Sequence, residues 1–219
     1  MGRMIRTAKP NSGGAARNPE RTRARILSAA LKEFAAKGFA GARVDAIARR
    51  AAINKRMLYH YFGDKEGLFR AVLRRKIAER QAWAESLSGD PAESLPFWFK
   101  LSCKDADWIR LLEWEALQGA EKKLIDGESR RKLAVRSIHR IREQQARGHV
   151  SREFDPRLVL LAMRSLVIFP LAFPQLTKLI VGGPVFEPRF QKKYAQFLKQ
   201  FAAAFQPATG QRINIKFTD

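Results

Sequence analysis

The sequence predicts an all-α fold, with a three-helix head that contains a helix-turn-helix and a larger helical body behind it. Apolar residues recur at steps of three and four along most of the chain, which is the spacing of one helix face. Gly, Pro, Asn and Asp separate the periodic segments, as they do at helix ends. With 219 residues, 46% of them hydrophobic, the chain is long enough to bury a substantial core.

Charge is distributed unevenly along the chain. The net charge is +21, and residues 1–80 hold 20 Lys and Arg against 6 Asp and Glu, whereas residues 81–219 hold 22 against 15. A strongly basic end joined to a milder body is typical of a nucleic-acid-binding module attached to another domain. Composition alone leaves open a protein that is merely basic.

Several features favour a cytoplasmic protein without a membrane partner. A single cysteine, Cys103, excludes an internal disulfide framework and favours a reducing compartment. The N-terminal residues are positively charged but lack the apolar segment of a secretory signal. The most hydrophobic run, residues 158–173, is interrupted by Arg164 and Pro170 and is too short to cross a bilayer.

The N-terminal part is expected to be an arm followed by a first helix. Residues 1–19 lack periodicity and are interpreted as a flexible basic arm, either a DNA contact or a solvated tail. Residues 20–37 are predicted to be helical, and Gly38 lies where a helix end needs a positive φ. The inward side chains of this helix are expected to be Ile26, Leu27, Ala30, Leu31, Phe34 and Ala35.

Residues 44–51 and 54–61 are predicted to form two short helices joined by a tight turn. One apolar stripe on the first and Leu58 with Phe62 on the second would share a core. Asn54 is the expected cap of the second helix. The outer faces of that helix carry cationic and hydroxyl-bearing side chains, which makes this the layout of a DNA-binding helix-turn-helix.

The first turn after the cap is expected to reach base edges, because a helix fits the major groove, roughly 12 Å wide, with its N-terminal residues toward the bases. Lys55, Arg56 and Met57 occupy that turn. Arginine can bind guanine as a fork, and a thioether suits a thymine methyl group. A solvated Arg56 is the alternative.

Tyr59, His60 and Tyr61 are expected at phosphates, which position the protein without specifying sequence. Partial packing of Tyr61 against the first helix and simple hydration of His60 remain alternatives.

Gly63 is expected to end this helix and Asp64 to cap a fourth one that runs from about residue 65 into the eighties. Leu68, Phe69, Val72, Leu73 and Ile77 should face inward, and the charged series Arg70, Arg74, Arg75, Lys76 and Arg80 should mostly face solvent.

After a Ser-Gly-Asp-Pro break at 88–91, further helices are predicted at 92–104, 107–118, 121–147, from 156 onward, and 188–205. Pro170 and Pro174 are expected to kink or stop the helix that begins at 156. The tail, 206–219, is ambiguous because INIKF alternates like a strand.

The segment GFAGARVDAIARRAAINKRMLYHYFGDKEGLFRAVL resembles the signature of the TetR family of bacterial transcriptional regulators. The resemblance covers roughly residues 22–73 and depends on LYHYF, the following Lys-Glu pair and the upstream IA at family spacing. This chain departs from the pattern at Ala52, where Gly is usual, and at Ala42 and Arg43, where Thr or Ser is usual. It also departs at Arg56 and Met57, where a small residue and Thr are usual.

The resemblance implies a DNA-binding domain at 20–64 and a helical ligand-binding and dimerisation domain at 65–205. It matches Tyr59, Tyr61 and Lys65 to positions that hold the DNA backbone. The full set of expected DNA contacts is Arg43, Asn54, Lys55, Arg56, Met57, Tyr59, His60, Tyr61 and Lys65. Their expected partner is a double-stranded DNA operator.

Four tryptophans within about thirty residues suggest an aromatic-lined pocket in the body, although a role in the core alone is equally compatible with them. The resemblance favours a small-molecule effector, of unknown identity, between these helices. The expected lining residues are Trp98, Phe99, Ser102, Cys103, Trp108 and Trp114.

The last two helices have wide apolar faces, and the resemblance implies that they form a four-helix bundle in a homodimer. The expected interface residues are Leu158, Leu161, Phe169, Tyr194, Phe197 and Phe201. A two-fold axis would make the operator a near-palindrome.

Catalysis is not expected. His60, His139 and His149 lie far apart without metal-ligand spacing, and no phosphate-binding or nucleophile motif appears, so no metal or cofactor is expected. The sequence therefore favours a sequence-specific regulator, most simply a ligand-responsive repressor. A basic DNA-binding protein of low sequence preference without a ligand, and an enzyme that has acquired a DNA-binding head, are the alternatives.

Overall fold

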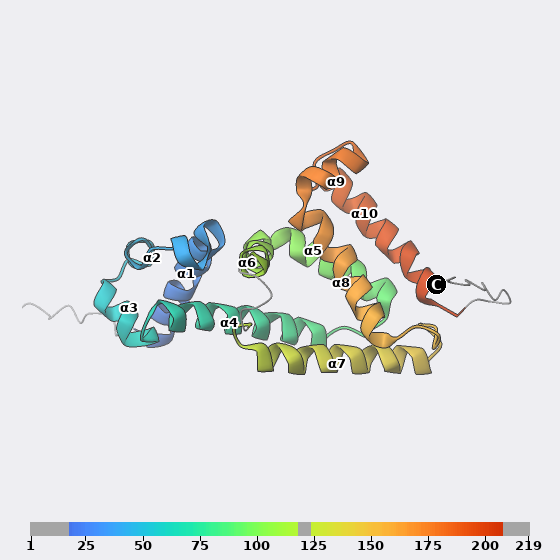
Figure 1. Cartoon of the computed structure of the whole chain (residues 1–219), viewed down its shortest axis with the longest axis horizontal. Coiled ribbons are helices and arrows are strands. Elements are labelled where there is room, and N and C mark those ends of the chain that lie inside the picture. Colours follow the sequence, from blue (N-terminus) through green and yellow to red (C-terminus); the bar gives the residue numbers. More distant parts are fainter. Residues whose placement is uncertain (1–17, 118–123, 208–219) are drawn as a thin grey trace, which may run out of the picture.

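The computed structural model describes residues 18–117 and 124–207, and within these ranges every regular element is a helix (Figure 1). The all-α fold is confirmed. The helices are α1 (Pro19–Gly41), α2 (Val44–Arg50), α3 (Lys55–Phe62), α4 (Lys65–Glu85), α5 (Pro91–Lys104), α6 (Ala106–Ala116), α7 (Gly127–Ala146), α8 (Pro156–Ala172), α9 (Pro174–Val181), α10 (Pro188–Phe201) and the 3-10 turn η1 (Ala202–Phe205). The N-terminal arm and most of the tail lie outside the described residues.

Helices α1–α3, called the head below, lie at one end of the molecule, and α4–η1 form the body (Figure 1). Helix α4 runs from the head along the lower edge of the body, with α7 beside its far half. Helix α6 belongs to the body and packs against α1 of the head, while α5 packs against both α8 and α10. The buried apolar side chains of head and body form one contiguous cluster, from Ile26 to Phe205.

Local capping chemistry explains where the helices of the head begin and end. The Asn54 side chain accepts a hydrogen bond from the Met57 N–H at 2.7 Å, and the Asp64 side chain accepts one from the Gly67 N–H at 2.6 Å. Gly63, between them, has φ +77° and ends α3. Gly38 has φ +67° and interrupts α1 where the sequence predicted the end of that helix.

Of the two prolines predicted to kink or stop the helix that begins at Pro156, Pro174 marks the stop, whereas Pro170 lies inside the helix. A proline lacks the N–H that would bond the carbonyl four residues earlier, here that of Leu166. The Tyr194 hydroxyl of α10 donates to that carbonyl at 2.9 Å, so the group freed by Pro170 keeps a partner and α8 continues to Ala172. Pro174 then begins α9, which is bent by 93° from α8.

Three further predictions need correction. Helix α7 begins at Gly127, and the described residues 124–126 before it are not helical, so the helix does not run on from about 121; residues 121–123 themselves lie outside the described ranges. The α-helical part of the last helix ends at Phe201, and a 3-10 turn completes the segment to 205. Lys76 and Arg80 of α4 were expected to face solvent mostly, but their side chains are 10% and 11% exposed. Their partner is Asp105 at the start of α6, which sequence spacing could not reveal.

Candidate functional site

Helix α3 is held to the head by its inner face, and its outer face is open to solvent. Leu58 is fully buried and anchors α3 against the rest of the head. Lys55, Arg56, Tyr59 and His60 are exposed, whereas Met57 and Tyr61 are half-buried. The six residues of α3 that are expected to meet DNA therefore divide into four exposed side chains and two half-buried ones.

The turn between α2 and α3 is held by α1. Ala52 has φ +49°, in the left-handed region that disfavours a side chain with a Cβ atom. The Arg25 guanidinium of α1 donates hydrogen bonds to the carbonyls of Ala51 and Ala52. Arg25 thus ties α1 to the turn from which α3 starts.

The first turn of α2 has an unusual cap. Arg43 precedes this helix, and its own side chain makes no cap hydrogen bond. Its backbone N–H instead donates to the Glu33 carboxylate of α1 at 3.3 Å. Glu33 thus holds the backbone just before α2, although it does not bond the first-turn N–H groups that a hydroxyl cap would take, and the exposed Arg43 side chain remains available to a phosphate.

Two of the predicted DNA-contacting lysines have partners within the chain. The Lys55 ammonium group lies 3.0 Å from the Asp45 carboxylate, which raises the pKa of Lys55 through the hydrogen bond and the charge of Asp45. The Lys65 ammonium group donates to the Ala40 carbonyl at 3.1 Å and lies over the Phe39 ring. An ammonium group has three N–H donors, so each lysine retains donors for a phosphate.

The body contains a cavity of about 280 Å³ between α4, α5, α6, α7 and α8. Three of the six predicted ligand-binding residues line it, namely Trp98, Ser102 and Trp108. Around them are mainly apolar side chains, such as Leu112 and Leu133, so the cavity has the largely apolar lining of a small-molecule site.

The other three predicted ligand-binding residues lie elsewhere. Phe99 is fully buried and packs against Tyr194, with ring centroids 4.8 Å apart. Cys103 is half-buried away from the cavity, and burial raises the pKa of its thiol to about 11, so the thiol stays protonated at neutral pH. Trp114 joins body to head, because its indole N–H donates to the Ala35 carbonyl of α1 at 3.2 Å.

Sequence reasoning did not identify the four arginines of the cavity: Arg80, Arg130, Arg140 and Arg164. They come from α4, α7 and α8, so no single segment carries a signal for them. Burial lowers the pKa of Arg80, although Asp105 opposes the shift. Desolvation of its guanidinium likewise lowers the pKa of Arg164, although the residue as a whole is exposed.

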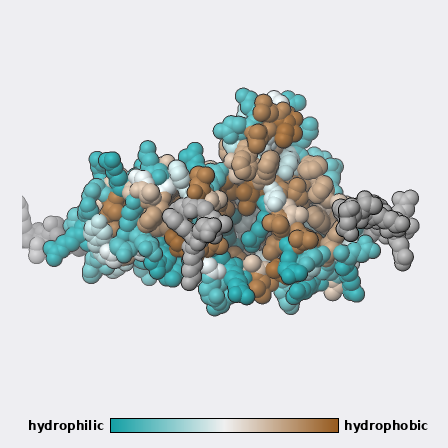
Figure 2. Space-filling view, in the orientation of Figure 1, coloured by the Kyte–Doolittle hydropathy of each residue, from teal (hydrophilic) through white to brown (hydrophobic). Residues whose placement is uncertain are grey.

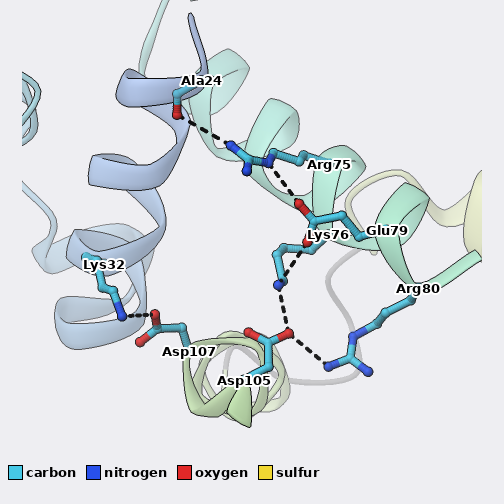
Figure 3. Close-up of polar contacts among 8 residues, drawn as sticks. All are labelled: Ala24, Lys32, Arg75, Lys76, Glu79, Arg80, Asp105 and Asp107. Atoms are coloured by element: carbon cyan, nitrogen blue, oxygen red, sulfur yellow. Dashed lines mark hydrogen bonds and ion pairs between the residues drawn. The ribbon is translucent and has the colours of Figure 1, made fainter. Parts of the chain in front are cut away.

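A chain of ion pairs leads from the cavity to the head (Figure 3). Asp105 lies 3.1 Å from Arg80 and 2.7 Å from Lys76, and Lys76 lies 3.1 Å from Glu79. Burial alone would raise the pKa of Glu79, but hydrogen bonds from Arg75 and Lys76 outweigh it and lower the pKa. This chain of ion pairs is called the relay below.

Arg75 is the last side chain of the relay. It donates to Glu79 at 2.9 Å and reaches the Ala24 carbonyl of α1 at 3.4 Å (Figure 3). A separate ion pair, Lys32 with Asp107 at 2.6 Å, joins α1 to α6 at the surface. A cavity residue and a helix of the head thus belong to one polar network.

Apolar side chains remain exposed on the outer faces of α8 and α10. Leu158 and Leu161 are 64% and 61% exposed, and Phe169, Phe197 and Phe201 are also exposed. Tyr194 differs from the other predicted interface residues, because it is half-buried and its hydroxyl bonds within the chain.

Helix α9, which the sequence did not predict as a separate helix, adds a further apolar surface. Leu179 and Ile180 are 81% and 76% exposed, and Figure 2 shows a hydrophobic area over this helix at the top of the molecule. Within the described ranges no single helix is long and apolar enough to cross a membrane, and only the bent pair α8 and α9 together would meet that length and composition.

Comparison with known proteins identifies the family. Residues 26–72 match the model described as bacterial regulatory proteins of the tetR family, and residues 98–186 match a tetracyclin repressor-like C-terminal domain. The chain is 33% identical over 173 residues to the HTH-type transcriptional repressor SCO4008 of Streptomyces coelicolor, which covers 77% of this chain and 88% of that protein. It is 48% identical over 62 residues to the HTH-type transcriptional repressor NicS of Pseudomonas putida, which covers 28% of this chain and 29% of that protein.

A solved structure extends the likeness over most of the chain. The transcriptional regulator SCO4942 from Streptomyces coelicolor superposes with a TM-score of 0.70 at 26% identity, covering 85% of this chain and 98% of that one. Fold, recognition helix and relatives together define a helix-turn-helix transcriptional regulator, and the chain belongs to the TetR family. Proteins of this family bind DNA operators, typically as dimers with small-molecule effectors.

Proposed function

We propose that this protein is a homodimeric repressor that reads a palindromic operator and releases it when a small molecule occupies the cavity of the body. The observation that carries the proposal is the exposed first turn of α3, held by the Asn54 cap and the buried Leu58. Lys55 and Arg56 then face the bases, while Arg43, Tyr59, His60, Tyr61 and Lys65 face phosphates.

Dimerisation is supported by the exposed apolar faces of α8 and α10. Side chains such as Leu158 and Leu161 leave a stripe on the body that a second copy would cover. An interface of this kind is isologous, so the two heads are related by a two-fold axis and meet half-sites one helical turn, about 34–36 Å, or a multiple apart.

Release of the operator needs a ligand that favours one spacing of the heads over another. The relay gives a physical route, because Arg80 lines the cavity and Arg75, at the other end, holds the Ala24 carbonyl of α1. A ligand that draws Arg80 away from Asp105 alters the partners of Lys76 and Glu79. The position of α1 then changes too, because Arg75 joins Glu79 to α1. A difference in affinity of a few kcal/mol between the two states suffices.

Fluorescence anisotropy with operator and scrambled duplexes tests the assignment of the reading residues. Arg56→Ala should cost about 1–3 kcal/mol on the operator and relax the preference at one base position. Lys65→Ala should weaken operator and scrambled DNA alike, because a phosphate contact carries no sequence information. Equal behaviour of the two variants on both duplexes contradicts the assignment.

Light scattering tests the dimer. The expected result is a dimer whose dissociation is promoted by Leu161→Glu, a substitution on the exposed face of α8. Val135→Glu on the exposed face of α7 is the matched control and should leave the dimer intact. A monomer at all concentrations removes the geometric basis of the palindromic operator.

A further inference from the structure

The cavity of the body has a strong imbalance of charge. Four guanidinium groups line it, those of Arg80, Arg130, Arg140 and Arg164, and its described lining residues include no aspartate or glutamate. Arg80 and Arg130 have side chains only 11% and 17% exposed, whereas Arg140 is half-buried and Arg164 is exposed. Cations that are largely withdrawn from water are unfavourable without matched anions. Such a cavity requires negative charge from within the protein or from a ligand.

The described carboxylates outside the lining compensate only part of this charge. Glu115 lies 2.6 Å from Arg130, and Asp105 lies 3.1 Å from Arg80 but is shared with Lys76. Arg140 donates to a backbone carbonyl, that of Ala84, which carries no full charge. The described residues place neither an ion pair nor a hydrogen bond on the Arg164 guanidinium.

Several N–H groups of these arginines also lack acceptors. The Nε of Arg80 and both Nε and Nη2 of Arg130 are buried and have no hydrogen-bond partner among the described residues, and one acceptor, Oε1 of the Glu115 carboxylate beside Arg130, is unpaired as well. Buried polar groups of folded proteins are nearly always paired, with protein, water or ligand. Unpaired donors on two helices, α4 and α7, bordering the same cavity indicate an acceptor that occupies it.

The remainder of the lining is apolar and aromatic. The Arg80 guanidinium lies 4.9 Å from the centroid of the Trp108 ring, and Trp98 borders the same space. Leu133, Met163 and Val167 are among the apolar side chains that also line it. A ligand must therefore combine an anionic group with an apolar part.

We propose that the effector site takes a small organic anion, a carboxylate or phosphate monoester attached to a compact aromatic or aliphatic body. This proposal rests on the proposed function, of which it specifies the effector class. The cavity of about 280 Å³ is of the size that takes a small organic molecule. The anionic group of the ligand is bound by the guanidinium groups as a charge-assisted acceptor, and its apolar part packs against the indoles.

Quenching of tryptophan fluorescence provides the test, because Trp98 and Trp108 border the site. The probes are 1-naphthoate, 1-naphthyl phosphate and the neutral isostere 1-naphthamide. Charge-assisted hydrogen bonds make at least one anion bind about 10- to 100-fold more tightly than the amide. The tighter of the two anions identifies the source of the charge. Equal affinity of the amide and both anions overturns the proposal, as does quenching by none of them.

Variants locate the binding site within the cavity. Arg164→Met should weaken binding of the tighter anion about tenfold or more without affecting the amide. It leaves no described carboxylate without a partner, so the fold should persist. Arg136→Met is the matched control, since Arg136 lies on α7 with its side chain 51% exposed and outside the cavity lining. Loss of anion binding in both variants, or in neither, contradicts the assignment.

A second variant acts in the opposite direction. Glu115→Gln removes the internal carboxylate that competes for Arg130, so the anion should bind several-fold more tightly. Weaker or unchanged binding in folded Glu115→Gln protein contradicts the role of Arg130. Failure of these binding tests with operator binding intact refutes the effector class alone, whereas loss of operator recognition in the wild-type protein would refute the proposed function.

Discussion

The substitution Asp105→Asn perturbs the most buried ionic contacts between α4 and α6. The Asp105 side chain is 14% exposed and is shared by two cations, Lys76 at 2.7 Å and Arg80 at 3.1 Å. Asparagine preserves the shape but removes the charge. Both cations then remain largely buried, with Glu79 as the one described carboxylate still within reach of Lys76.

The expected magnitude follows from the burial of the group that is left behind. Removing one partner of a buried ion pair costs about 3–5 kcal/mol, because the other charge stays desolvated. Since Lys76 retains Glu79, a loss of about 3 kcal/mol in the free energy of unfolding is expected, and the melting temperature should fall by about 6–12 °C for a chain of this size.

Thermal unfolding followed by circular dichroism measures this loss, and Asp107→Asn provides the control on the same helix. Its ion pair with Lys32 lies at the surface, with Lys32 58% exposed, so the cost should be about 0–1 kcal/mol. Addition of Lys76→Met to Asp105→Asn should recover part of the lost stability, because it removes an uncompensated charge. Equal small losses for the two Asp variants would refute the account of the relay as a buried network.

The remaining predictions concern backbone strain and pH. Ala52→Gly should raise the free energy of unfolding in urea by about 0.5–1 kcal/mol, because Ala52 has φ +49° and relief of that strain exceeds the entropy that glycine adds to the unfolded chain. Gly38→Ala should destabilise by about 2–4 kcal/mol, since its Cβ would lie 2.8 Å from the Trp114 ring; Gly63→Ala, at φ +77° in open space, should lose only about 1–2 kcal/mol. The pKa of Glu79 is lowered in the folded state, so the ionised carboxylate contributes its full stabilisation above the ordinary pKa of 4.5. This stabilisation is lost as the pH falls through the lowered folded-state pKa. The melting temperature should therefore decline in that range, and it should decline less in Glu79→Gln. Three results would contradict these arguments: an unchanged free energy of unfolding in Ala52→Gly, equal losses of stability in the two glycine variants, or the same decline of melting temperature at acid pH in Glu79→Gln as in the original protein.

Elements set by local chemistry could be predicted from the sequence. Asn54 and Asp64 cap the helices that follow them because the acceptor and the N–H lie three residues apart. The buried Leu58 follows from helical spacing in the same way. The recognition helix was therefore predictable almost to its ends.

Features that depend on distant partners could not be predicted. Lys76 and Arg80 belong to a charged series along α4, and only the position of Asp105 shows that they are buried. Pro170 remains helical because Tyr194, on another helix, takes up the carbonyl it leaves free. In each case the deciding contact joins residues more than twenty positions apart.

The cavity illustrates the same limit. Its tryptophans stood out because they cluster in the sequence, and Trp98 and Trp108 do line it. Trp114 looked equivalent but contacts the head. Arg164 stood out only as an interruption of a hydrophobic run, although in the fold it faces the cavity together with arginines from two other helices.

Selection of bound duplexes from random-sequence DNA tests the central claim most directly, since the α3 helices of two protomers are proposed to read adjacent major grooves. We expect one consensus with two-fold symmetry, whose half-sites are separated by about 10–10.5 base pairs or a multiple. In Arg56→Ala, the base preference should disappear at one position of each half-site. Recovery of duplexes without a shared sequence, or with a single unrepeated half-site, would contradict the central claim.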